Sequence, residues 1–105
     1  MARIDDIGGR FERGEFEFSR HAVDQTLRRS ISVVEVQQAA NGADIIEDRP
    51  NDKYGPSCLL LGYTDIGRPI HIHCSYPDRS LIKLITVYEP DPNRWIDFKT
   101  RKPSP

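Results

Sequence analysis

Two histidines, His71 and His73, are separated by one residue in a segment that alternates apolar and polar side chains. On a β-strand this spacing puts both imidazoles on one face, about 7 Å apart. Neutral imidazole accepts a proton near pH 7 and imidazolium returns it, so the pair could serve in acid–base catalysis or contact a substrate. Alternatively, the pair supplies two zinc ligands, with His21 or an aspartate as the third, or has no chemical role.

A third histidine, His21, lies at the start of a predicted helix over residues 20–29. Asp24 follows one turn later and could orient the imidazole, and Arg28 shares the same helix face seven residues on. His21 could therefore act as a proton shuttle. A half-buried histidine that only packs explains the same sequence equally well.

Two further polar side chains complete a candidate site. Arg68 lies in a predicted hairpin turn, from which a long cationic side chain could reach an anion over the strand face, and Tyr88 ends the most apolar predicted strand. Metal-independent RNA cleavage needs such groups, namely a base for the 2′-hydroxyl, cations for the phosphate and an acid for the leaving oxygen. We assign as catalytic candidates His21, His71 and Tyr88, and as substrate-binding candidates Arg28, Arg68 and His73, with no cofactor.

The elements that position these residues begin with helices. Helical spacing predicts helices over residues 2–13, 20–29 and 33–40. Ser19 is placed to cap the second, and a capping box from Ser32 to Glu35 opens the third. A short extended piece is expected around residues 16–18, and Pro92 could open a short C-terminal helix that carries Trp95 and Phe98.

Strand signals dominate the second half of the chain. Alternation and turn residues predict strands from residue 44 and over residues 57–64, 69–76 and 81–88. Their tight connections imply an antiparallel meander. The expected fold is α+β, with N-terminal helices packed on one face of a four-stranded antiparallel sheet. Alternation puts Ile70, Ile72 and Cys74 toward the core, leaves both strand histidines on an open face, and groups Tyr88 with residues 82, 84 and 86.

Composition bounds the function. The chain has 105 residues, a net charge of −1 and 37% hydrophobic residues, which suits one α+β domain over residues 1–99 followed by a flexible tail over 100–105. No apolar run approaches the roughly 18 residues of a membrane span. The charged N-terminus lacks the apolar core of a signal peptide, so a soluble cytoplasmic protein is expected. A neutral total argues against tight nucleic-acid binding, although residues 67–105 carry seven basic and four acidic side chains.

The two cysteines, Cys58 and Cys74, lie in apolar segments without CxxC spacing. In a cytoplasmic chain we expect buried thiols that behave as small hydrophobic side chains. A disulfide between neighbouring strands is the alternative.

Four strings carry a family resemblance. They are Ser19-Arg20-His21-Ala22, Arg28-Arg29-Ser30-Ile31-Ser32, Gly67-Arg68-Pro69-Ile70-His71, and Ile85-Thr86-Val87-Tyr88-Glu89-Pro90-Asp91-Pro92 followed by Trp95. Over roughly residues 18–99 the chain resembles the small bacterial proteins grouped as domain of unknown function 4258. The resemblance implies a fold akin to the RelE and BrnT-like toxins, which are commonly messenger-RNA interferases paired with an antitoxin. His73 stands beside the matched motif, and the chain lacks the strongly basic character of many such toxins.

Three hypotheses follow. The leading one is a toxin-like ribonuclease, or a degenerate relative of one, that acts on RNA. The second is a non-catalytic module that binds an antitoxin-like protein, and the third is a zinc-binding protein that uses His71 and His73. A homodimer is also considered, and a membrane is not expected as a partner.

Overall fold

Three helices precede the main strands. The computed structural model, which describes residues 3–53 and 55–103, places them at α1 (Arg3–Glu12), α2 (Arg20–Arg29) and α3 (Val33–Ala40). Ser19 caps α2 by accepting the amide of Ala22 at 3.0 Å, and Ser32 and Glu35 form the predicted capping box of α3. Both caps satisfy backbone N–H groups that a first helical turn leaves without partners, so these two helix starts are confirmed. Residue 2 of the first predicted helix lies outside the described residues.

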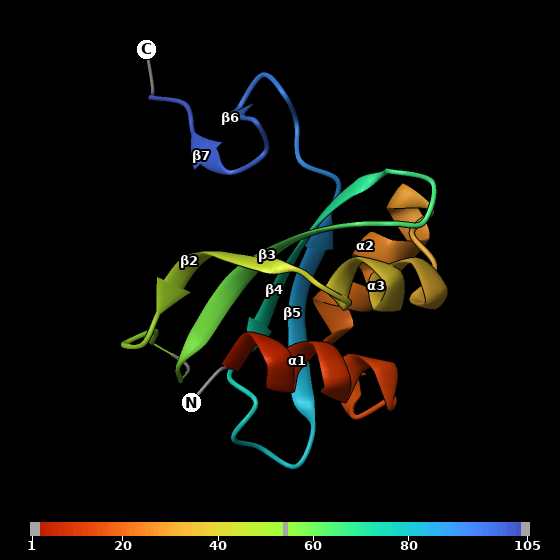
Figure 1. Cartoon of the computed structure of the whole chain (residues 1–105), viewed down its shortest axis with the longest axis vertical. Helices are drawn as coiled ribbons and strands as arrows, with labels where there is room; N and C mark the ends of the chain where they lie inside the picture. Colours follow the sequence, from red (N-terminus) through yellow and green to blue (C-terminus); the bar gives the residue numbers. More distant parts are fainter. Residues whose placement is uncertain (1–2, 54, 104–105) are drawn as a thin grey trace.

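The strands form a five-stranded sheet. They are β1 (Phe16–Phe18), β2 (Asp44–Arg49), β3 (Ser57–Tyr63), β4 (Pro69–Ser75) and β5 (Ile82–Tyr88), in the order β1-β5-β4-β3-β2 (Figure 1). The α+β class is confirmed, but the expected four-stranded antiparallel sheet is wrong in detail. The short extended piece β1 joins as a fifth strand parallel to β5, and β4 lies at the centre of the sheet. Strand β1 has only three residues, which is too short for alternation in the sequence to indicate which strand it pairs with.

A β-bulge changes which side chains share a face of β5. The register with β4 shifts between His73 and Cys74, which makes Ile85 an extra residue on β5. Leu84, before the bulge, packs in the core, whereas Tyr88, after it, pairs with His71 on the opposite face. The expected alternation that grouped Tyr88 with residues 82 and 84 is therefore wrong, because a bulge reverses the facing of all later residues.

One face of the sheet packs against the helices and forms the core. The three strand residues expected there, Ile70, Ile72 and Cys74, are fully buried in it. Helix α2 also covers the edge of β5, where the Gln25 side chain accepts the Val87 amide at 2.8 Å. None of the described helices is long and apolar enough to cross a membrane.

The two cysteines lie directly opposite each other on β3 and β4. Both Cys58 and Cys74 are buried and not joined by a disulfide, as expected. A hydrogen bond with Cys58 and burial raise the pKa of the Cys74 thiol. The Cys74 thiol therefore stays protonated, and both side chains pack in the core.

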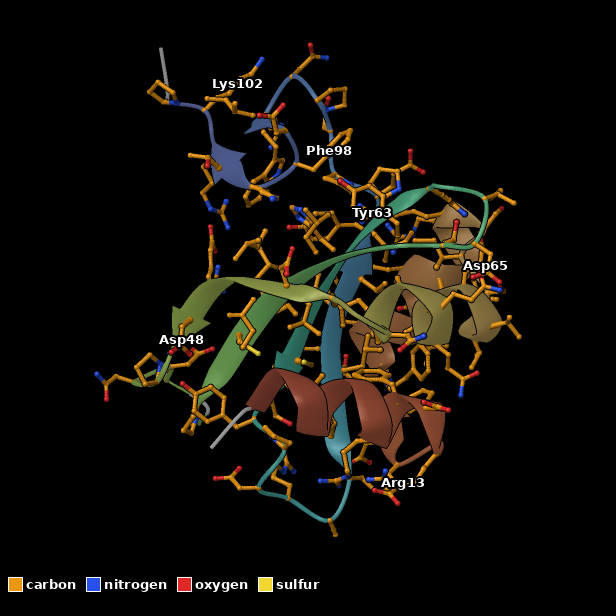
Figure 2. All side chains as sticks on the ribbon, in the orientation of Figure 1. Arg13, Asp48, Tyr63, Asp65, Phe98 and Lys102 are labelled. Carbon is orange, nitrogen blue, oxygen red and sulfur yellow. The ribbon has the colours of Figure 1, made fainter. Side chains whose placement is uncertain are left out.

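A C-terminal hairpin covers part of the other face. Its strands are β6 (Trp95–Ile96) and β7 (Thr100–Arg101), joined by a turn in which Asp97 and Phe98 both have left-handed backbone, with φ of 53° and 62° (Figures 1 and 2). The helix expected from Pro92 is therefore wrong, since a turn around Asp91 leads straight into a strand. Residues 100–101, expected within a tail, form β7, and residues 104–105 lie outside the described residues.

Candidate functional site

His71 is fully buried beneath this hairpin. Its Nε2 lies 2.6 Å from the carbonyl oxygen of Phe98, and its Nδ1 lies 3.1 Å from the hydroxyl of Tyr88. A carbonyl can only accept, so we assign the ring proton to Nε2, and Nδ1 then accepts the proton of Tyr88. Burial lowers the pKa of His71, which favours this neutral form. His71 therefore holds Tyr88 and the hairpin in place, and no longer faces the open surface expected from the sequence.

Tyr88 itself is half-buried and accessible from one side. The guanidinium of Arg29, from α2, lies 5.9 Å from the centre of its ring. Burial raises the pKa of the phenol, so it stays protonated at neutral pH. Tyr88 therefore offers a proton donor that is oriented from behind by His71.

His73, two residues along β4, lies on the same face. Its Nε2 is 2.9 Å from the hydroxyl of Ser57 and 3.7 Å from a carboxylate oxygen of Asp52. Burial lowers the pKa of His73, and the charge of Arg49 lowers it further, against an opposing effect of Asp52. His73 is therefore neutral near pH 7 and able to accept a proton.

Two arginines flank these side chains. Arg101, from β7, contacts both carboxylate oxygens of Glu47 at 2.7 and 3.2 Å, and Arg49 contacts the same carboxylate at 2.7 Å. Hydrogen bonds from Arg101 and then Arg49 lower the pKa of Glu47. Arg101 also lies 4.7 Å from the ring centre of Trp95. Glu47 thus holds together two cations from distant parts of the chain.

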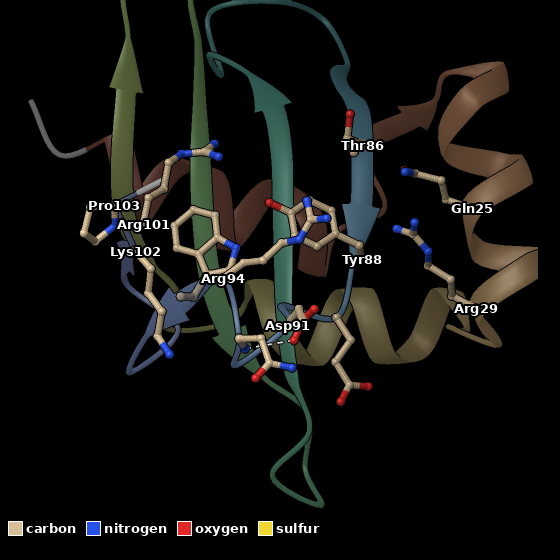
Figure 3. Close-up of a pocket in the computed structure, with 12 residues that line it drawn as sticks. Gln25, Arg29, Thr86, Tyr88, Asp91, Arg94, Arg101, Lys102 and Pro103 are labelled. Carbon is tan, nitrogen blue, oxygen red and sulfur yellow. Dashed lines mark hydrogen bonds between the residues drawn. The ribbon is translucent and has the colours of Figure 1, made fainter. Parts of the chain in front are cut away.

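Three neighbouring cavities follow this face of the sheet, and we call them together the groove. The central cavity, of about 180 Å³, is lined by Arg49, Leu59, His73, Thr86, Tyr88 and Arg101. A cavity of about 890 Å³ shares Thr86, Tyr88 and Arg101 with it, and one of about 660 Å³ shares Arg49 and His73. Figure 3 shows the largest of them, with Gln25 and Arg29 extending from α2 toward Tyr88.

The groove is more basic than the protein as a whole. Among its described lining residues are seven basic and four acidic side chains, in a chain whose net charge is −1. The basic ones are Arg29, Arg49, Arg79, Lys83, Arg94, Arg101 and Lys102. A concave surface with this excess attracts anions.

A family model matches residues 18–89 of the chain. The chain belongs to this family, described as a domain of unknown function (DUF4258). The matched segment contains β1 to β5 except for Phe16 and Glu17, and it carries all six residues predicted from the sequence. The hairpin that contributes Trp95 and Arg101 lies beyond it. Neither the curated proteins nor the solved structures yielded a match to the chain.

The DUF4258 segment brings three of the six predicted residues together, namely His71, His73 and Tyr88. His21 and Arg28 are exposed on α2, and neither is among the described residues that line the groove. His21 lies one turn before Gln25, which does line it, so His21 is close to the rim by helix geometry.

Arg68 performs a different task from the expected one. Its guanidinium donates to Glu89 at 2.7 Å, to Glu35 at 3.1 Å, and to the backbone carbonyls of Arg29 and Ser30 at the end of α2. The hydrogen bond with Glu89 and then that with Glu35 raise its pKa. Arg68 therefore joins the β3–β4 turn to α2 and α3, away from His71.

The charged residues that surround His71, His73 and Tyr88 were not identified from the sequence. Tertiary contacts bring Arg29, Arg49 and Arg101 to the groove lining, and Glu47 pairs with the last two. The only sequence signal was the basic C-terminal third that contains Arg101. Among the described residues there is no group of three or more His, Cys, Asp or Glu side chains that could hold a metal ion.

Proposed function

We propose that this protein binds RNA in the groove and cleaves it without a metal ion, by attack of a 2′-hydroxyl on the adjacent phosphate. One observation carries the proposal: the central cavity gathers Arg49, Arg101, His73 and Tyr88 around a space of about 180 Å³. These are the cations, base and acid that such a reaction requires.

Each residue has a role that its surroundings support. The neutral imidazole of His73 takes the proton of the 2′-hydroxyl, whose oxygen then attacks phosphorus and forms a 2′,3′-cyclic phosphate. Tyr88, kept protonated by burial, gives its proton to the departing 5′ oxygen. Arg49 and Arg101 stabilise the negative charge on the phosphate as the new bond forms.

The family likeness points the same way. The resemblance to domain of unknown function 4258 implies a fold akin to the RelE and BrnT-like toxins, which are commonly messenger-RNA interferases. Here the catalytic groups would be His73 and Tyr88, with His71 as a positioning residue behind Tyr88. The low net charge of −1 suits a modest RNA affinity that depends on the groove.

The test is cleavage of a fluorescent single-stranded RNA by the purified protein in the presence of a chelator. We expect a product that ends in a 2′,3′-cyclic phosphate, and a rate that falls at least about 100-fold in His73→Ala and in Tyr88→Phe. His21→Ala and Arg28→Ala serve as controls outside the groove lining. Cleavage that persists in His73→Ala, or on a substrate with deoxyribose at every position, rules out this mechanism.

A second candidate function is binding of an antitoxin-like protein through α2. Val23 and Leu27 lie one turn apart on this helix and are 41% and 77% exposed. A partner protein that packs on this side of α2 would bury both apolar side chains and remove them from water. Co-expression with the product of the adjacent gene, followed by measurement of the native mass of the purified species, tests it. A complex that forms with the wild type and is lost in Leu27→Glu supports this function, and a monomer in both contradicts it.

A further inference from the structure

Asp52, Ser57 and His73 form a continuous hydrogen-bonded chain beside the central cavity. The hydroxyl of Ser57 lies 2.5 Å from a carboxylate oxygen of Asp52, and 2.9 Å from Nε2 of His73. Asp52 belongs to the loop between β2 and β3, Ser57 begins β3, and His73 lies on β4. The chain thus joins one loop and two strands at a single imidazole.

The direction of these bonds follows from what each group can donate. A hydrogen bond from Ser57 and further contacts lower the pKa of Asp52, so its carboxylate is ionised at neutral pH and can only accept. The single hydroxyl proton of Ser57 is therefore given to Asp52. The oxygen of Ser57 must then accept from His73, which puts the imidazole proton on Nε2.

We propose that Asp52 and Ser57 are positioning residues that hold His73 with its proton on Nε2, which leaves Nδ1 to accept the substrate proton. The proposal rests on the ribonuclease function proposed above. It assigns to Asp52 and Ser57 a role in the reaction that acts through His73, without a part in the bonds that form and break. An imidazole held by a second group in one tautomer is ready to react each time the substrate binds.

The same geometry excludes Ser57 as a nucleophile. Its side chain is fully buried, and its proton points to a carboxylate rather than to the imidazole. A serine activated for acyl transfer would instead donate to the histidine, with the carboxylate on the far ring nitrogen. The chain of groups therefore serves to orient His73.

Other charged and titratable groups also act on His73. From β2, Arg49 lowers its pKa and Glu47 raises it. Tyr88 from β5 and Arg101 from β7 line the same central cavity. A change in the pH dependence of the reaction is assigned to Asp52 and Ser57 only when the tautomer of His73 changes with it.

The first test is nitrogen NMR of the protein labelled with ¹⁵N-histidine at pH 7.5, with the His73 signals assigned by their loss in His73→Gln. The wild type should show a protonated Nε2 and an unprotonated Nδ1. In Ser57→Ala and in Asp52→Asn the two tautomers should mix, and Ser57→Thr, which keeps the hydroxyl, should restore the single form. Ser80→Ala is the control, because Ser80 is an exposed serine that is not among the described residues lining the groove.

The second test is the pH dependence of kcat/KM for RNA cleavage. Ser57→Ala should lower kcat/KM by about 10- to 100-fold and shift its acidic limb, while Ser80→Ala leaves both near the wild type. Wild-type protein that cleaves RNA with the proton of His73 on Nδ1, or Ser57→Ala with an unchanged tautomer, overturns the positioning roles. Wild-type protein with the Nε2 proton and no cleavage instead overturns the ribonuclease function and leaves the assigned tautomer standing.

Discussion

The hydroxyl of Tyr88 donates to Nδ1 of His71 at 3.1 Å, and the opposite nitrogen of the same ring donates to the carbonyl of Phe98 at 2.6 Å. Residues from β5, β4 and the C-terminal hairpin are thus joined through one buried imidazole. Since Tyr88 lines the groove and the hairpin contributes Arg101 to it, His71 couples the position of the proposed acid to that of a proposed phosphate ligand.

This relationship predicts the effect of Tyr88→Phe on stability. Removal of the hydroxyl leaves Nδ1 of the buried His71 without its donor, which should cost about 1–3 kcal/mol of unfolding free energy. Urea unfolding at pH 7.5 measures it. Tyr63→Phe is the control, because Tyr63 is exposed and its change should stay within about 0.5 kcal/mol. An equal effect of the two substitutions would show that the contact with His71 contributes nothing.

The lowered pKa values of His71 and His73 predict a pH dependence of stability. Both groups bind a proton less readily in the folded state than at their ordinary value of 6.5. Below pH 6.5 the unfolded chain therefore takes up more protons, and stability should fall as the pH decreases from 6.5 toward the lowered values. The urea midpoint measured from pH 7.5 to 5.0 should show this loss, and His71→Gln should reduce its slope. A flat profile in the wild type would contradict the burial of these rings in neutral form.

Local signals explain which parts of the fold could be predicted from the sequence. Ser19, Ser32 and Glu35 act on amides within three residues, so the sequence nearby suffices to place the starts of α2 and α3. Likewise, the uninterrupted alternation of β4 predicts correctly that Ile70 and Ile72 face the core.

Long-range contacts explain which parts of the fold and of the site could not be predicted from the sequence. The bulge at Ile85 depends on the pairing of β5 with β4, and it turns Tyr88 toward His71 against the simple alternation. Arg101 and Glu47 are 54 positions apart in the chain, so no local sequence pattern predicts their ion pair. The groove was therefore predictable only as a face that bears histidines, without the arginines that make it basic.

The ion pairs of Glu47 predict that its neutralisation tightens RNA binding. Glu47 occupies both Arg49 and Arg101, which the proposed function assigns to the phosphate. Glu47→Gln removes the competing charge, so the affinity for a short RNA should rise several-fold and depend more steeply on salt. Fluorescence anisotropy at two salt concentrations measures both. Glu17→Gln, at an exposed position on β1, is the charge-matched control, and equal affinities of the two variants would refute competition by Glu47.

The contacts of Arg68 predict a structural role that is separate from RNA binding. Arg68→Ala removes the hydrogen bonds to Glu35, Glu89 and the end of α2, which should cost about 2 kcal/mol after allowance for solvent screening. RNA affinity, measured at a temperature where the variant is folded, should stay within about twofold of the wild type. A much larger loss of affinity at unchanged stability would place Arg68 in the RNA-binding surface.

Two glycine substitutions should have opposite effects on stability, because only Gly62 lies where α3 closely approaches β3. A Cβ on Gly62 would overlap the backbone carbonyl of Ala39, which cannot move without displacing the helix. Gly62→Ala should therefore lower stability by about 3 kcal/mol. Gly9→Ala, in α1, would meet only the flexible end of the Arg13 side chain, so better helix propensity should raise stability by up to about 1 kcal/mol. Thermal and urea unfolding of both variants measure the difference, and a stable Gly62→Ala protein would show that α3 does not pack against β3 in this way.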